Sequence, residues 1–167
     1  MFPWSSTTAL PTTSTRCPGG SEGTIPFGDN AFDVVLNRHE SYLASEVGRV
    51  LKPGGAFLTQ QVADGWSDDL HDVLGLPRPP ATGFTRDFAV TQAEAGGLTV
   101  VESGEGADLV AYADVAPLVW YVRITAWAVP GLDPAASRPL WREVQRRIES
   151  DGPLVLREPR FWLRATV

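Results

Sequence analysis

Residues 25–62 contain a strand–helix–strand pattern, and few folds are compatible with it. Residues 32–36 are a short, nearly continuous apolar run, which is typical of a strand covered on both faces. The spacing of apolar residues predicts a helix over about residues 43–51, and the Pro-Gly-Gly sequence at 53–55 ends it. Residues 56–62 form a second apolar strand. Two strands joined through a helix are parallel with a right-handed crossover, so the pattern predicts an α/β fold.

Composition and charge exclude several classes of protein. A length of 167 residues fits one domain, and 43% hydrophobic with 20% charged residues is ordinary for a globular chain. The formal charge of −6 gives a polyanion little attraction, so a nucleic-acid coat protein is not expected. Cys17 is the only cysteine and His39 and His71 are the only histidines, so we expect no metal site.

The chain divides into a head and a domain. Residues 1–24 are rich in Ser, Thr, Pro and Gly and lack periodicity, so we expect a low-complexity, disordered head. Residues 25–167 are expected to form a partial α/β domain. The start of the sequence has neither the basic segment nor the apolar segment of a secretory signal. Asp114 and Arg123 interrupt the most apolar stretch. We therefore expect no membrane span and a cytoplasmic protein.

The second half of the chain is less regular. We expect helices over residues 64–74 and 88–95, a strand over 98–103, a buried helix over 115–129 and an amphipathic helix over 134–150. Two closing strands, 154–157 and 160–166, are separated by Glu158-Pro159, which predicts a hairpin.

Two motifs in the strand–helix–strand segment resemble those of one enzyme family. Residues 25–36, IPFGDNAFDVVL, resemble the LPF-x-D-x-S-F-D-V-V signature of class I S-adenosylmethionine-dependent methyltransferases, and residues 46–58, EVGRVLKPGGAFL, resemble the E-x-x-R-V-L-K-P-G-G segment of the same family. The resemblance is weaker at residues 93–98 and 161–163. It implies a Rossmann-like fold, incomplete at the N-terminus, with a mostly parallel sheet, a closing antiparallel strand, and S-adenosylmethionine as cofactor.

The resemblance also implies where the methyl donor lies. In such enzymes the carboxyl end of this strand faces the methyl group, which places Asn37, Arg38, His39 and Glu40 on the cleft floor. Glu22 matches a residue that approaches the adenine of the donor. The tetrad differs from the Asn-Pro-Pro-Tyr/Phe of many amino-group methyltransferases, so no base or glutamine N-methylase is predicted. His39 is the candidate general base, and the alternative is that it caps or packs against the following helix.

Two side-chain orientations stay open. Arg38 pairs either with a carboxylate or phosphate of the substrate, or with Glu40 or Glu46 in a salt bridge. Gln60 and Gln61 end the next strand, and the two-residue period of a strand points one into the cleft and the other away.

The acceptor is harder to predict. Substrate choice is expected to depend on segments such as 63–87 and 104–133. Trp120, Tyr121 and Trp127 are expected in the core, with a role as the roof of an acceptor pocket as the alternative. A basic helix face is expected to be solvated rather than to bind RNA; it comprises Arg138, Arg142, Arg146 and Arg147. A small-molecule acceptor is favoured over a nucleic acid, and no membrane partner is expected.

Part of the donor site of the family is absent before residue 25. Neither the glycine-rich E/D-x-G-x-G-x-G loop nor the acid that binds the ribose hydroxyls is found there. The strand at 32–36 would then have an exposed edge. Three alternatives stay open: a partner chain or second copy covers this edge, the head folds over it, or the chain is truncated. We therefore expect a methyltransferase that is truncated and inactive alone, a non-catalytic remnant that acts as an interaction module, or a site completed by another chain.

Overall fold

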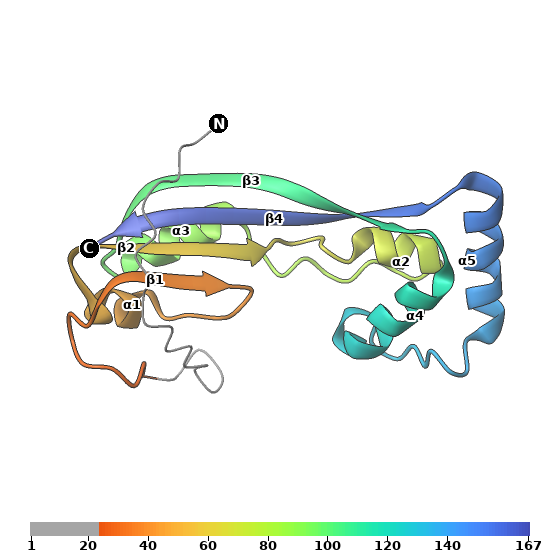
Figure 1. The fold of residues 1–167 in the computed structure, drawn as a ribbon, viewed down its shortest axis with the longest axis horizontal. Helices are drawn as coiled ribbons and strands as arrows, with labels where there is room; N and C mark the ends of the chain where they lie inside the picture. The colour runs from red at the N-terminus through yellow and green to blue at the C-terminus, as the bar shows by residue number, and fades with distance from the viewer. Residues whose placement is uncertain (1–23) are drawn as a thin grey trace, which may run out of the picture.

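The computed structural model describes residues 24–167, which form one mixed sheet and two groups of helices (Figure 1). The strands are β1 (Phe32–Arg38), β2 (Leu51–Val62), β3 (Thr99–Tyr112) and β4 (Leu154–Thr166). The helices are α1 (Ala44–Val50), α2 (Asp68–Leu74), α3 (Arg86–Ala95), α4 (Val115–Ile124), the short 3-10 helix η1 (Ala126–Ala128) and α5 (Arg138–Asp151).

The sheet has the strand order β1-β2-β4-β3. β1 and β2 are parallel, whereas β4 is antiparallel to both of its neighbours, β2 and β3. Three strands therefore run one way and the closing strand runs against them. The predicted α/β fold, with a mostly parallel sheet and a closing antiparallel strand, is confirmed.

Two hydrophobic cores lie at opposite ends of a long β3–β4 ribbon (Figure 1). In the first core, α1 and α3 cover one face of the sheet, where Val47 and Ala93 pack with Phe57 and Phe161. In the second core, α2, α4 and α5 pack around Leu118, and this core joins the sheet through the ribbon. The opposite face of the sheet has exposed apolar side chains, and no described helix covers it.

The Pro-Gly-Gly sequence lies within β2, in an irregularity of its pairing with β1. β2 begins at Leu51, before the glycines, rather than at residue 56 as expected. Gly54 has a φ of +77°, in the left-handed region that glycine adopts without steric cost. A Cβ atom on Gly55 would lie 2.8 Å from the carbonyl oxygen of Lys52, so only glycine fits there.

The predicted hairpin at Glu158-Pro159 is wrong, because β4 is continuous from Leu154 to Thr166. The carbonyl oxygen of Pro159 accepts from Ala63 N–H just beyond the end of β2. The amide and carbonyl of one strand residue point to the same side, so the missing N–H of Pro159 also faces this side and not β3. A proline is tolerated because the main ladder between β3 and β4 loses no donor.

Other elements differ from expectation in extent. The strand predicted over 98–103 continues to Tyr112 as β3, because it pairs with β4 along the whole ribbon. The helix predicted over 115–129 ends at Ile124 and is followed by η1. Within residues 24–167, no helix combines the length and apolar character that crossing a bilayer requires.

Candidate functional site

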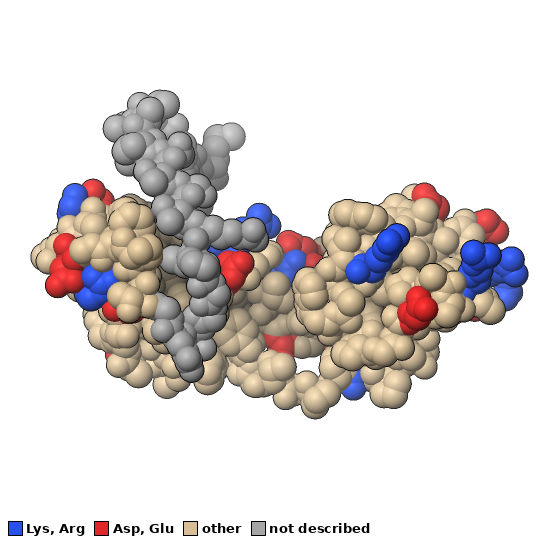
Figure 2. Space-filling view, turned by 90° about the horizontal axis from the view of Figure 1, so that it is seen from below, with Lys and Arg blue, Asp and Glu red and all other residues tan. Residues whose placement is uncertain are grey.

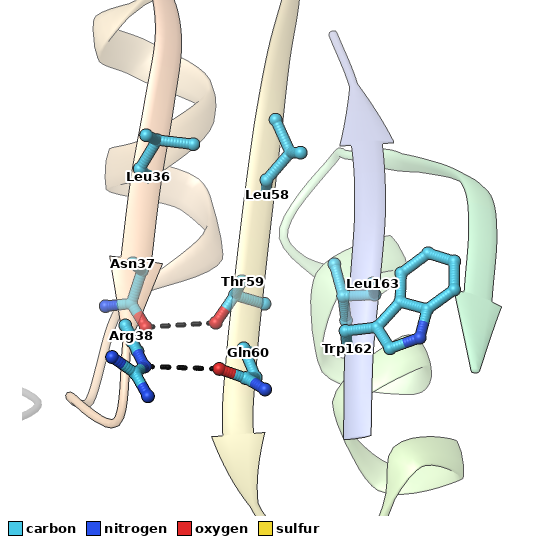
Figure 3. Close-up of a pocket in the computed structure, with 8 residues that line it drawn as sticks. All are labelled: Leu36, Asn37, Arg38, Leu58, Thr59, Gln60, Trp162 and Leu163. Atoms are coloured by element: carbon cyan, nitrogen blue, oxygen red, sulfur yellow. Dashed lines mark hydrogen bonds between the residues drawn. The ribbon is translucent and has the colours of Figure 1, made fainter. Parts of the chain in front are cut away.

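The carboxyl ends of β1 and β2 lie next to each other at one edge of the sheet, where Arg38 pairs with Gln60. A shallow depression of about 420 Å³ lies there on the open sheet face (Figure 3). Its lining residues are Leu36, Asn37, Arg38, Leu58, Thr59, Gln60, Trp162 and Leu163. The depression thus has apolar walls from three strands and a polar end formed by Arg38 and Gln60.

Asn37 is held in a polar cluster. Its Oδ1 atom accepts hydrogen bonds from Thr59 Oγ1 at 3.0 Å and from Gln61 Nε2 at 2.6 Å. Gln61 also donates to the carbonyl oxygen of Glu40 at 3.0 Å, and Thr59 and Gln61 are buried. The cluster therefore ties the end of β1 and the loop after it to β2.

Arg38 and Gln60 interact on the open face of the sheet. Arg38 Nε donates to Gln60 Oε1 at 3.2 Å (Figure 3). No carboxylate of residues 24–167 lies within salt-bridge distance of Arg38, and Glu46 instead binds Arg49, so of the two alternatives the salt bridge to Glu40 or Glu46 is wrong. Gln60 faces the depression and Gln61 the opposite side, as the strand period predicted.

His39 follows β1 directly and has a φ of 57°, in the left-handed region. Its N–H donates to the carbonyl oxygen of Gln60 at 3.0 Å, which extends the pairing of the two strands by one residue. The side chain is exposed and does not cap α1, whose N-cap residue is Leu43. Partial burial lowers the pKa of His39, and the positive charges of Arg160 and Arg38 lower it further. The neutral imidazole that a general base requires is therefore favoured.

A charged cluster on the ribbon lies close enough to His39 to affect its pKa, and the sequence analysis missed it. Arg160 Nε donates to Asp108 Oδ2 at 3.0 Å, and Arg160 also binds Glu158. Tyr121 of α4 donates its hydroxyl to Glu158 at 3.3 Å, and burial and Glu158 raise the pKa of Tyr121 far above its usual value. Glu158, Arg160 and Trp162 are spaced two residues apart, as on one face of a strand. The expected hairpin broke this strand and so obscured the pattern.

The aromatic residues of α4 and η1 are only partly in the core. Tyr121 packs against the second core, as expected. Trp120 and Trp127 are 62% and 71% exposed, so their prediction as core residues is wrong. The periodicity of the segment indicated one long buried helix. Trp120 instead lies off the buried face of α4, which comprises Leu118 and Val122, and the break at Thr125 separates Trp127 from α4.

The arginines of α5 gather at one end of the molecule with acidic side chains beside them (Figure 2). Arg146 pairs with Glu143, and Arg147 donates to the carbonyl oxygen of Val73. This agrees with a solvated helix face. Among the described residues, no group of three or more His, Cys, Asp or Glu side chains is placed to hold a metal ion.

Two predictions concern residues outside those that the structure describes. Glu22, the residue expected near the adenine of the donor, lies outside residues 24–167. The low-complexity head of residues 1–24 lies almost wholly outside them too. Both stay predictions.

Comparison with known proteins gave one short sequence match. No family model matches the sequence. The chain is 38% identical over 50 residues to the uncharacterized protein YafE of Escherichia coli, a match that covers 26% of this chain and 24% of YafE. The matched segment thus spans about a quarter of that relative.

Solved structures similar to this chain include class I methyltransferases, the family whose motifs residues 25–58 resemble. The candidate methyltransferase BH2331 of Bacillus halodurans has a TM-score of 0.49 and 17% identity, with 85% of this chain and 72% of that chain covered. YcgJ of Bacillus subtilis has a TM-score of 0.45 and 15% identity over 85% and 66% of the two chains. Geranyl diphosphate C-methyltransferase of Streptomyces coelicolor, solved with S-adenosylhomocysteine, has a TM-score of 0.40 and 16% identity over 85% and 48%.

Proposed function

We propose that this chain is part of an S-adenosylmethionine-dependent methyltransferase and that the donor lies against the carboxyl ends of β1 and β2. One observation carries the proposal. The two segments that resemble the family motifs, residues 25–36 and 46–58, form the approach to β1, β1 itself, α1 and β2, with the two strands parallel. Ligands of parallel α/β sheets bind outside the carboxyl ends of the strands, where Asn37, Arg38 and His39 stand.

The described residues fit one side of such a donor. Leu36 and Leu58 offer apolar contacts, and Gln60 offers an amide at the end of the depression. Residues 24–167 include no glycine-rich loop of the E/D-x-G-x-G-x-G type. We assign the rest of the donor site to polypeptide outside these residues, in this chain or in a partner.

The donor supplies an electrophilic sulfonium methyl group, so the chain has to position the acceptor and exclude water. His39, whose pKa is lowered by partial burial and by the charges of Arg160 and Arg38, is the proposed acceptor of a proton from a substrate that must lose one. Arg38 faces the depression with a guanidinium group that no acidic side chain of the described residues neutralises, which suits a carboxylate or phosphate on a small-molecule acceptor.

A second function, that of an interaction module, is favoured by the exposed apolar side chains on the open face of the sheet. Leu36 is 75% exposed, and Val34, Leu58 and Trp162 are exposed beside it. β1 is an edge strand of the described sheet, and its unpaired backbone groups are open to another strand. A partner chain or a second copy is the proposed occupant, and the same association can complete the donor site.

Calorimetric titration of S-adenosylhomocysteine into the full chain tests the two functions, with light scattering to determine the oligomeric state. Binding at micromolar or tighter affinity, abolished by Leu58→Arg and unaffected by Leu109→Arg on β3, supports the methyltransferase. A folded chain that associates and binds no S-adenosylhomocysteine supports the interaction module and excludes the donor site.

A further inference from the structure

The buried histidine of the second core touches two carbonyl groups from different parts of the chain. His71, in α2, is only 5% exposed. Its Nδ1 atom lies 2.5 Å from the carbonyl oxygen of Pro77, in the loop after α2, and its Nε2 atom lies 2.7 Å from the carbonyl oxygen of Ala128, in η1. One imidazole ring thus connects three segments: α2, the loop between α2 and α3, and η1.

A backbone carbonyl oxygen only accepts hydrogen bonds, so both ring nitrogens must donate to satisfy both contacts. A neutral imidazole carries one N–H, and in either tautomer the other nitrogen would direct its lone pair at a carbonyl oxygen. Only the imidazolium ion donates at both nitrogens. We propose that the doubly protonated form of His71 is a pH-sensitive latch that holds the loop after α2 and η1 together.

The two contacts differ in what happens when the ring loses a proton. Ala128 and its neighbour Val129 are buried, so no water is available to replace the histidine there. Pro77 and the residues that follow it are exposed, so water can take over its carbonyl group. The neutral ring therefore keeps its proton on Nε2 and releases Pro77. The loop loosens and η1 stays in place.

The charged groups around His71 come from several elements. Asp72 of α2 stands next to it and binds Arg78 of the loop; hydrogen bonding to Arg78 lowers the pKa of Asp72, and the charge of His71 contributes. Asp69 of α2 accepts the backbone N–H of Arg157 in β4. Arg147 of α5 reaches the carbonyl oxygen of Val73, and η1 has the sequence Ala-Trp-Ala, without a titratable group.

The loop released by the latch leads into α3, which packs on the sheet that has the candidate site. At its far end the loop is fixed by Asp64, which accepts from Thr82 and Gly83. The release of Pro77 therefore leaves the loop held by Asp64 at its far end and by the ion pair of Arg78 with Asp72. This device is independent of the proposed methyl transfer and holds whether or not the chain binds a donor.

Imidazole nitrogen NMR of the full chain between pH 5 and 8 tests the latch. Because His39 is the only other histidine, His39→Gln leaves His71 as the single imidazole signal. Both nitrogens of His71 are expected to carry protons at low pH, and Nδ1 alone to lose its proton as the pH rises. Over the same range, once the intrinsic base-catalysed rise in amide exchange is divided out, the protection of the Leu76 N–H is expected to fall about tenfold and that of the Ala128 N–H to stay unchanged.

A ring with one unprotonated nitrogen at every pH would overturn the latch, and so would loop exchange that does not follow the titration of His71. His71→Gln has a single amide nitrogen and supports only one of the two contacts. If this variant folds, the protection of the Leu76 N–H in it is expected to be low at all pH values. If it does not fold, the His39→Gln protein still decides the question.

Discussion

Gln61 Nε2 lies 2.6 Å from Asn37 Oδ1, so the first residue of the predicted cleft floor is bound to a buried amide on the neighbouring strand. The same nitrogen of Gln61 donates to the carbonyl oxygen of Glu40 at 3.0 Å. Gln61 therefore fixes both ends of the turn in which Arg38 and His39 are exposed. The position of the candidate base depends on this buried pair rather than on contacts of the imidazole itself.

Asn37→Ala is expected to destabilise the chain by about 1–3 kcal/mol, because the buried donors of Thr59 and Gln61 lose their common acceptor. Asn37→Asp keeps the acceptor oxygen and is expected to cost less near neutral pH. Urea unfolding measures both. Arg38→Ala, on the exposed face, is the matched control, with a change within about 0.5 kcal/mol. Equal stability of Asn37→Ala and the parent chain would show that the cluster contributes nothing.

Arg38→Gln is expected to raise the pKa of His39 toward its ordinary value of about 6.5, because it removes one of the positive charges that lower it. Burial and Arg160 also lower this pKa, so the shift is partial. Histidine NMR titration of the parent chain and the variant measures it.

The sign of the linked stability follows. A lowered pKa of His39 in the folded state contributes stability above about pH 6.5 that is lost as the pH falls through the folded value. Arg38→Gln should therefore weaken the pH dependence of unfolding in this window. An unchanged pKa of His39 would mean that Arg38 is too well screened by solvent to act on it.

The local pattern of residues 25–62 was enough to predict the parallel β1–α1–β2 unit. The apolar runs and the glycines after α1 determine local structure through residues that are close in the sequence, so no tertiary contact is needed to interpret them. The long ribbon could not be predicted in this way. Pro159 is normally a turn signal, and it is tolerated here only because its missing N–H faces the end of β2, a relationship between residues about a hundred positions apart.

The same dependence on long-range contacts explains why the charged cluster near His39 was not predicted. Glu158, Arg160 and Tyr121 come together only when β4 is continuous and α4 packs on its end. The orientation of the two glutamines could be predicted, since the two-residue period of a strand assigns Gln60 and Gln61 to opposite faces whatever the rest of the fold. His71 gave no local signal, because its two carbonyl partners belong to segments chosen by tertiary packing.

Thr82→Val is expected to raise the pKa of Asp64. The Thr82 hydroxyl donates to Asp64 Oδ1 at 2.6 Å and is the largest cause of the lowered pKa, with backbone N–H groups of Thr82 and Gly83 adding to it. Carboxyl NMR titration measures the change. Glu94→Gln, on the exposed side of α3, is a control that should leave the pKa of Asp64 as it is.

The lowered pKa of Asp64 also sets an acid limit for the loop before α3. Its contribution is present above about pH 3.9, the ordinary value for aspartate, and is lost as the pH falls through the lower, folded value. Asp64→Asn should remove this part of the acid dependence. An acid unfolding profile identical to that of the parent chain would show that Asp64 contributes nothing to stability in this pH range.

Leu36→Lys is expected to weaken association of the chain without destabilising its fold. Leu36 is 75% exposed on edge strand β1, so its replacement costs the isolated fold about 0.5 kcal/mol or less. If a partner or second copy covers this face, burying the leucine contributes about 1.5–3 kcal/mol to the contact, roughly ten- to hundredfold in affinity. A lysine there also blocks strand addition at the edge.

Sedimentation equilibrium over a range of concentrations, with urea unfolding in parallel, separates the two effects. Leu109→Lys, at a leucine that is 70% exposed on β3, is the matched control and should associate like the parent chain. An equal loss of association in both variants would indicate nonspecific hydrophobic contact. A parent chain that stays monomeric at all concentrations would show that the β1 face does not bind a second copy, and a different polypeptide would then be the occupant to seek.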